Sequence, residues 1–280
     1  VPNLQSVFYH SKVRKKWPDK CEKIKKILSD KATFYKNCGI DHVIPEFFVI
    51  DKSIVKYPEW AYEKLKNKGL ILKPSRGYSG KNVYHYYFKN NYLFFRHLNT
   101  NKTGNLNFSG NIDEIKNHWL TSTKSRSNLL IMPFISNSKD LPKTNGAIVI
   151  RIVTFKEKPN STVKVRYSWC EIPFGRGHIF IDKNGKVINI QKNKLSLELK
   201  NKIILWEKIV LNDKDLSNKL YLSEIYSRKL HESLSNINSI AWDWIPTQNN
   251  TLLLEGNSDF GLLIPQLVDH LNNDNYNYYI

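Results

Sequence analysis

The chain alternates short apolar runs with segments rich in glycine, proline and asparagine. Short apolar runs bounded by turn residues are typical of buried strands, and alternating aromatic residues are typical of strands with one packed face. Asn90 and Asn91 separate two such runs and predict a hairpin. The predicted strands cover residues 47–50, 70–72, 83–88, 92–95, 128–135, 147–155, 163–173, 240–245 and 251–255.

Helical patterns lie between these runs. Asp30 is a capping residue ahead of a helix that stops at Gly39, and a second helix over residues 58–68 stops at Gly69. The polar tract 99–110 is predicted to be a long loop. Mixed α and β structure follows from this alternation. Further helices are predicted within residues 1–28, 113–120, 195–211 and 216–234.

The segment LILKPSRGYSGKNV, residues 70–83, places Lys73 at the mouth of a loop with two glycines. Pro74 has no N–H, so we expect it to end the strand ladder. Gly77 and Gly80 let backbone amides approach a ligand closely, and amide-lined loops suit phosphate. The spacing does not match a P-loop. The alternative is a strand connection that needs glycine only for its turn geometry.

A predicted hairpin near the C-terminus carries two carboxylates in apolar strands, Asp243 and Glu255. Asn257 lies two residues after Glu255, so both side chains share one face of the strand, and Asp243 lies opposite them in a tight hairpin. These hard oxygen donors suit Mg²⁺. The alternative is that the carboxylates pair with Arg151 or with surface lysines. Arg151 lies inside the apolar run AIVIRIVTF, where it is either part of a structural salt bridge or a contact for an anionic ligand.

Composition indicates a folded protein with an anionic partner. The 280 residues are 41% hydrophobic, and 43 Lys+Arg against 25 Asp+Glu give a net charge of +18. This charge favours binding to nucleotides, acidic peptides or glycans, nucleic acid, or peripheral association with an anionic membrane. A solvated, lysine-rich surface is the alternative. Three widely spaced cysteines predict neither a disulfide framework nor a zinc site, and the chain lacks a transmembrane run and a signal-peptide pattern, so we expect a cytoplasmic protein.

Nucleophilic catalysis has no support in the sequence. There is no GxSxG elbow, and the segment His231–Ser235 lacks the second histidine of an HExxH motif. We therefore expect His231 to lie on an exposed helix face. Cys170 is expected to be a packing residue.

The order of these motifs resembles the ATP-grasp superfamily. The phrases LILKPSRGYSGKNV, GAIVIRIVTF and IAWDWIPTQNNTLLLEGN are most similar to the sugar-transfer-associated ATP-grasp group, and the resemblance spans residues 30–266. It implies an α+β fold, in which two α/β lobes hold a nucleotide between antiparallel sheets and the N-terminal lobe is reduced. The implied division is an N-terminal basic segment (1–55), a small lobe with the glycine loop (56–133) and a large lobe with the metal site (134–280).

The resemblance also implies roles for individual residues. Lys31 and Lys73 correspond to phosphate-contacting lysines, and Arg151, like Lys73, is placed for catalysis at the transferred phosphoryl group. Asp243, Glu255 and Asn257 correspond to magnesium ligands. Cofactor contacts with ATP are expected from the loop residues Ser75, Gly77, Ser79 and Gly80, from the backbone of Met132 and Phe134, which Pro133 leaves free of the ladder, and from Asp140 at the ribose.

The implied reaction joins a carboxylate to an amine through an acyl-phosphate, with ATP and Mg²⁺ as cofactors and with a role in bacterial surface polysaccharide. Arg166, Arg176 and His178 are candidates for binding an anionic sugar, peptide or small-molecule substrate, although charge at Arg176 and His178 departs from the small residues of the family. One alternative is a tubulin tyrosine ligase-like enzyme, against which the missing lysine- and aspartate-containing phrase before Arg151 counts. Another is a non-enzymatic basic binding protein. The aromatics of residues 83–96 alternate like a sheet packing face, so we expect no nucleic-acid partner.

Overall fold

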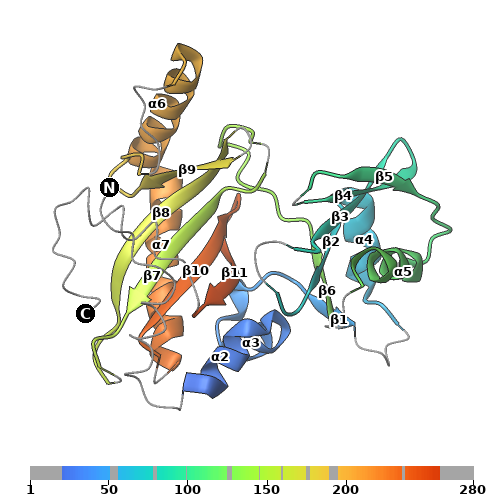
Figure 1. The fold of residues 1–280 in the computed structure, drawn as a ribbon, viewed down its shortest axis with the longest axis horizontal. Coiled ribbons are helices and arrows are strands. Elements are labelled where there is room, and N and C mark those ends of the chain that lie inside the picture. Colours follow the sequence, from blue (N-terminus) through green and yellow to red (C-terminus); the bar gives the residue numbers. More distant parts are fainter. Residues whose placement is uncertain are drawn as a thin grey trace. The chain divides into compact units, whose positions relative to one another are not determined.

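The structure is a computed structural model that divides into two compact units. Among the described residues, unit 1 contains 21–28, 39–43 and those from 136 onward, and unit 2 contains 29–38 and those from 44 to 135. Each unit is built on one antiparallel sheet (Figure 1). The described ranges are 21–50, 56–77, 81–98, 100–124, 128–144, 146–158, 160–174, 177–188, 195–234 and 237–258.

Unit 2 contains a six-stranded sheet in the order β1-β6-β2-β3-β4-β5, together with three helices. Helix α3 begins after Asp30, whose side chain accepts a hydrogen bond from the Thr33 amide, as the sequence predicted. Gly69, at φ +93°, follows the end of α4, also as predicted. The elements are α3 (Lys31–Asn37), β1 (Phe48–Ile50), α4 (Glu59–Asn67), β2 (Leu70–Pro74), β3 (Tyr84–Lys89), β4 (Tyr92–His97), β5 (Thr103–Leu106), α5 (Ile112–Thr123) and β6 (Leu129–Pro133).

Two expectations for this sheet are corrected. Pairing of β2 with β3 ends at Leu72, but pairing with β6 continues to Pro74, so the proline ends the ladder on one side only. The tract 99–110 is not all loop, because Thr103–Leu106 forms the edge strand β5 beside β4. A Cβ at Gly104 would lie 2.8 Å from the Phe95 ring, so glycine allows this close approach.

The turn between β3 and β4 is the predicted hairpin. Asn90 and Asn91 both have positive φ angles, +50° and +63°, as in a type I′ turn. Glycine adopts this conformation at lower cost than asparagine. Replacing Asn91 with glycine should therefore raise the free energy of unfolding by about 0.5 kcal/mol in urea denaturation. The same change at Asn105, inside β5, should destabilise the protein, and a loss at both positions would contradict the turn assignment.

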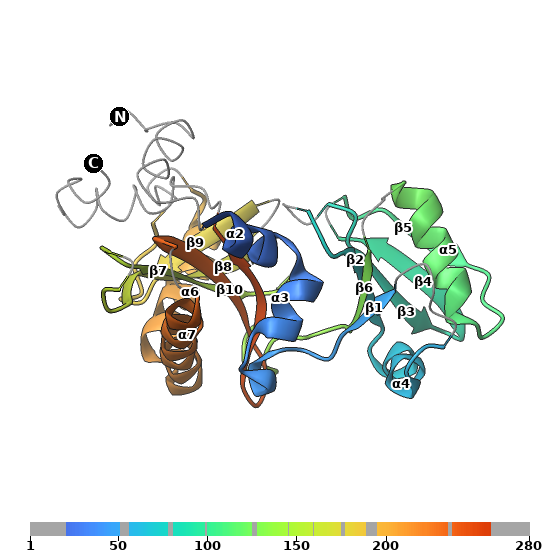
Figure 2. The ribbon, with the colours of Figure 1, turned by 90° about the horizontal axis from the view of Figure 1, so that it is seen from below.

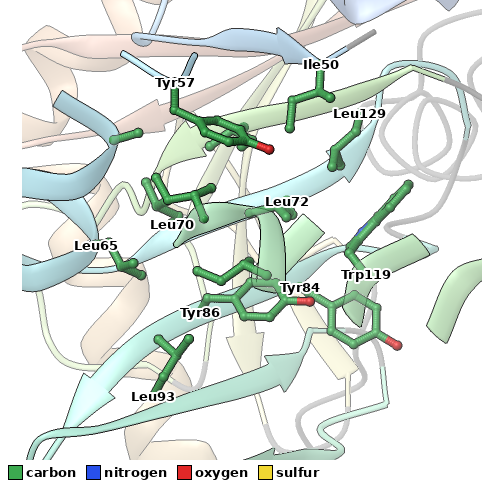
Figure 3. Packing of buried hydrophobic residues seen from close by; sticks show 14 residues of the cluster. Ile50, Tyr57, Leu65, Leu70, Leu72, Tyr84, Tyr86, Leu93, Trp119 and Leu129 are labelled. Atoms are coloured by element: carbon green, nitrogen blue, oxygen red, sulfur yellow. The ribbon is translucent and has the colours of Figure 1, made fainter. Parts of the chain in front are cut away.

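The core of unit 2 packs both longer helices against one face of the sheet. Alternating residues such as Leu70 and Leu72 point to this face, where Trp119 of α5 and Leu65 of α4 meet them (Figure 3). These four residues are at most 2% exposed. The other face of β2 and β6 is thereby left to the residues discussed as candidate ligands below.

Unit 1 contains a five-stranded sheet in the order β11-β10-β7-β8-β9. Helix α7 runs along this sheet and contacts β7, β8 and β10 (Figure 2). No described helix is long and apolar enough to cross a membrane. The elements are α2 (Cys21–Ser29), the short 3-10 helix η1 (Asp41–Val43), β7 (Val149–Phe155), β8 (Lys164–Phe174), β9 (Gly177–Asp182), α6 (Leu197–Asn212), α7 (Lys214–Ser233), β10 (Ser239–Pro246) and β11 (Thr251–Asn257).

The expectation of an exposed His231 is wrong. Its side chain is fully buried between α7 and the sheet, where Nδ1 lies 2.8 Å from Thr154 Oγ1 and Nε2 lies 2.9 Å from the Ile237 carbonyl. The carbonyl only accepts, so Nε2 carries the proton and Nδ1 accepts from Thr154. Trp242 Nε1 donates to the same hydroxyl at 2.7 Å. Each polar atom of this network has a partner, which removes most of the cost of burying the imidazole.

Candidate functional site

The first group of candidate residues surrounds Lys73 in unit 2. Lys73 is 8% exposed, and its ammonium donates to the Tyr35 hydroxyl at 3.5 Å and lies 5.7 Å from the centre of the Tyr35 ring. Strand β2 places Lys73 opposite Leu130 of β6. Burying a lysine is costly unless other groups compensate its charge, and the Tyr35 hydroxyl and ring are among the groups that do so here.

The segment Ser75–Gly77, which follows β2, is hydrogen-bonded to the start of α3. The backbone amide of Lys31 donates to the Ser75 carbonyl at 2.8 Å, and Lys31 Nζ donates to the Gly77 carbonyl at 3.0 Å. Asp30 accepts from Arg76 Nε at 2.9 Å. The structure therefore brings four sequence-predicted cofactor residues together, namely Lys31, Lys73, Ser75 and Gly77.

Asp30 remains a strong hydrogen-bond acceptor in this arrangement. Burial raises its pKa, but hydrogen bonds from Thr33 and Arg76 and the charge of Arg76 outweigh burial, so the pKa lies below its usual value. Asp30 is therefore ionised at neutral pH. Neither Asp30 nor Arg76 was among the residues predicted to form the site.

The expected backbone hinge is partly contradicted. Met132 lies opposite Ile71 in the ladder between β6 and β2, and the amide N–H of Phe134 donates to the Gly69 carbonyl at 3.0 Å. The N–H of Phe134 is therefore occupied, although Pro133 was expected to release this segment. Adenine recognition at Met132 and Phe134 stays a prediction. Ser79 and Gly80 of the glycine loop, and Arg176 of the substrate set, lie outside the described residues.

The second group forms a row across the sheet of unit 1. Asp243 of β10 lies opposite Glu255 of β11 and opposite Arg151 of β7, which confirms the predicted hairpin register. Arg151 donates to Asp243 twice, from Nε to Oδ1 at 2.5 Å and from Nη2 to Oδ2 at 2.6 Å. Arg151 Nη1 also lies 3.2 Å from Glu171 Oε1 of β8. The salt bridge that the sequence left as one of two readings is therefore present.

Glu255 and Asn257 extend the row on β11. Asn257 Nδ2 donates to Glu255 Oε1 at 2.8 Å, so the two side chains share one face as predicted. Glu171 also accepts from Trp169 Nε1 at 3.1 Å. Glu171 was not among the predicted site residues, although its spacing of two from Trp169 in a predicted strand already placed both on one face.

Three carboxylates, those of Asp243, Glu255 and Glu171, act electrostatically on one guanidinium in this row. Burial raises the pKa of Asp243 to about 6, Glu255 and Glu171 add to this rise, and the charge and bonds of Arg151 oppose it. Burial lowers the pKa of Arg151, but the ion pair with Asp243 raises it above its usual value. A cation bound beside Asp243 would favour its ionised form.

The donor chemistry of the row fits Mg²⁺. A carboxylate oxygen that accepts from arginine keeps a second lone pair, so Asp243 retains acceptor capacity, and Glu255 and Asn257 add further oxygen donors. Within the described part of the chain, no three Asp, Glu, His or Cys side chains form a metal-binding group. Proteins usually hold Mg²⁺ through one or two carboxylates together with substrate phosphates.

The remaining candidates in unit 1 are Asp140, Arg166 and His178. Asp140 is exposed and accepts from Gln248 Nε2 at 2.8 Å, which orients its carboxylate. Arg166 is half-buried with its guanidinium 5.6 Å from the Tyr167 ring, and His178 is exposed on β9. Cys170 is fully buried, and burial raises its pKa to about 12, as expected for a packing residue. The substrate and ribose roles stay predictions.

Comparisons with known proteins support the fold. No family model and no curated protein matches the sequence. The chain is similar to the D-alanine–D-alanine ligase from Bacillus anthracis solved with ATP, with a TM-score of 0.50, 14% identity, and coverage of 88% of this chain and 61% of that one. The Coxiella burnetii enzyme of the same name has a TM-score of 0.47 and 13% identity, with coverage of 87% of this chain and 52% of that one. The ADP complex of N5-carboxyaminoimidazole ribonucleotide synthetase has a TM-score of 0.44 and 11% identity, with coverage of 83% of this chain and 45% of that one.

The Bacillus anthracis likeness confirms the predicted α+β, ATP-grasp fold class. The identity is far too low to transfer a substrate, since one fold hosts many reactions. The chain also spans less than two thirds of the length of the first matched structures.

Proposed function

We propose that this chain, which has the ATP-grasp fold, is an ATP- and Mg²⁺-dependent enzyme that joins a carboxylate to an amine through an acyl-phosphate. The observation that carries the proposal is the row of Arg151, Asp243, Glu255 and Asn257 across three neighbouring strands of unit 1. The row places Asp243, Glu255 and Glu171 near the half-buried guanidinium of Arg151, and the two glutamates raise the pKa of Asp243.

The two groups of residues have different proposed roles. In unit 2, Lys73 and Lys31 hold nucleotide phosphates, and the backbone of Ser75 and Gly77 supports them. In unit 1, Asp243, Glu255 and Asn257 would hold Mg²⁺, which supplies charge neutralisation at the phosphates when bound. Arg151 stabilises negative charge on the phosphoryl group as it moves to the substrate carboxylate. An amine then displaces phosphate from the acyl-phosphate, so the protein needs no nucleophile of its own.

The substrate class proposed is an anionic molecule with a carboxylate, recognised through Arg166, Arg176 and His178. Modification of bacterial surface polysaccharide is the context proposed from the sequence resemblance. The likeness to a D-alanine–D-alanine ligase supports carboxylate–amine ligation as the reaction class. Fold comparison favours neither a peptide acceptor nor a sugar.

Titration calorimetry of a non-hydrolysable ATP analogue tests the proposal. Wild type should bind more tightly with Mg²⁺ than without it, and Asp243→Asn/Glu255→Gln should lose this Mg²⁺-dependent gain while keeping its metal-free affinity. The matched control is Glu157→Gln, which removes an exposed carboxylate paired with Lys164 in the same unit and should behave as wild type. Folded wild type that binds no nucleotide would refute the proposal.

A further inference from the structure

Asp30 and Arg76, which were not predicted site residues, lie where Lys31 meets the segment Ser75–Gly77. Asp30 and Arg76 form an antiparallel β-bridge, and directly beside it the Lys31 amide bonds the Ser75 carbonyl. The ion pair between the two side chains therefore lies next to both contacts that Lys31 makes with the loop segment. The ion pair and these contacts thus join the start of α3 to the same segment, Ser75–Gly77.

The burial of the pair is unequal. The Asp30 side chain is 10% exposed, whereas the Arg76 side chain is 70% exposed. A buried carboxylate requires partners, and Asp30 has two, because one oxygen caps α3 at Thr33 and the other accepts from Arg76. Most of the Arg76 side chain is exposed, but its Nε donates to the largely buried Asp30 carboxylate.

We propose that Asp30 and Arg76 act as a positioning pair for the nucleotide phosphates, an inference that rests on the proposed function. The pair holds the segment Ser75–Gly77 against the N-terminal end of α3, so that Lys31 and the loop backbone meet the phosphates in one fixed arrangement. Without it, nucleotide binding has to order this segment, and that ordering lowers affinity.

The alternative is that Asp30 only caps α3. Asp30→Asn separates the two roles, because asparagine is an equally good N-cap but has no charge and only one acceptor oxygen. Arg76→Gln removes the cation and leaves the cap intact. Arg76→Lys keeps the charge and should recover part of the effect.

The experiment measures the dissociation constants of ATP, ADP and adenosine by titration calorimetry. Asp30→Asn and Arg76→Gln should each weaken ATP and ADP binding about tenfold, a coupling typical of linked sites, and leave adenosine binding unchanged. The double variant should be no weaker than either single variant, because both changes break one interaction. Glu46→Gln, which breaks the exposed Lys64–Glu46 pair in the same unit, is the matched control and should bind as wild type.

The outcomes separate the two proposals. Wild-type ATP affinity in both single variants would overturn the positioning pair and leave the proposed function intact. An equal loss for ATP and adenosine, together with a lower melting temperature, would assign Asp30 a purely structural role and also overturn it. Wild type that binds no nucleotide at all would refute the proposed function and the pair with it.

Discussion

Replacing Arg151 with leucine should lower the free energy of unfolding by about 3–5 kcal/mol, the usual cost of removing one partner from a buried ion pair. Asp243 is 6% exposed and receives two hydrogen bonds from this guanidinium. Without Arg151, the carboxylate stays buried beside Glu255 and Glu171 and loses the positive charge that lowers its pKa. Urea denaturation followed by tryptophan fluorescence measures the change.

Two further variants define what the result means. Arg151→Leu/Asp243→Leu removes both charges and should recover most of the lost stability, because the penalty comes from the unpaired carboxylate. Lys164→Leu removes the cation of an exposed pair on the neighbouring strand and should change stability by less than about 1 kcal/mol. If Arg151→Leu were no more destabilising than Lys164→Leu, the row would not be an essential part of unit 1.

Arg151 also shows where sequence reasoning reaches its limit. The apolar run around it predicted a strand and required a partner, but the identity of the partner depends on strand register. Asp243 was predictable to lie beside Glu255, because a short hairpin fixes local register. The position of Arg151 opposite Asp243 joins residues 92 apart in sequence, and the contact with Glu171 depends in addition on the pairing of β7 with β8.

Strand β5 and the contact between Asp30 and Arg76 were also not predicted, because both depend on segments that are distant in sequence or lie on neighbouring strands. Strand β5, TGNL, has weak strand propensity, and it forms because β4 pairs with it and Gly104 admits the Phe95 ring. The Asp30 cap was predicted correctly, because capping is local. The second partner of Asp30, Arg76, comes from a different element, so the positioning pair could not be read from either segment alone.

The buried histidine of unit 1 was missed because its partners are distant in sequence. Thr154 and Trp242 lie in apolar strands, so the sequence predicts them to be core residues. In the structure Thr154 bonds His231 directly, and Trp242 donates to the same Thr154 hydroxyl. The charged group acting on His231 is Lys156, whose Nζ donates to the His231 carbonyl at 3.0 Å. Glu232 in turn acts on Lys156. Burial is the main cause that lowers the pKa of His231 to about 4, and Lys156 adds to it.

Acid should therefore destabilise the protein through His231. The pKa of histidine is 6.5 in the unfolded state and about 4 for His231 in the folded state, so the unfolded state binds more protons between these pH values. The free energy of unfolding therefore falls by about 3 kcal/mol as the pH drops through this range. Urea denaturation at several pH values should show that His231→Gln lacks this contribution. Thr154→Val keeps the imidazole, so it should be less stable at every pH but retain the same dependence of stability on pH. Parallel pH profiles for wild type and His231→Gln would contradict a neutral buried imidazole, because its protonation would then be the same in both states.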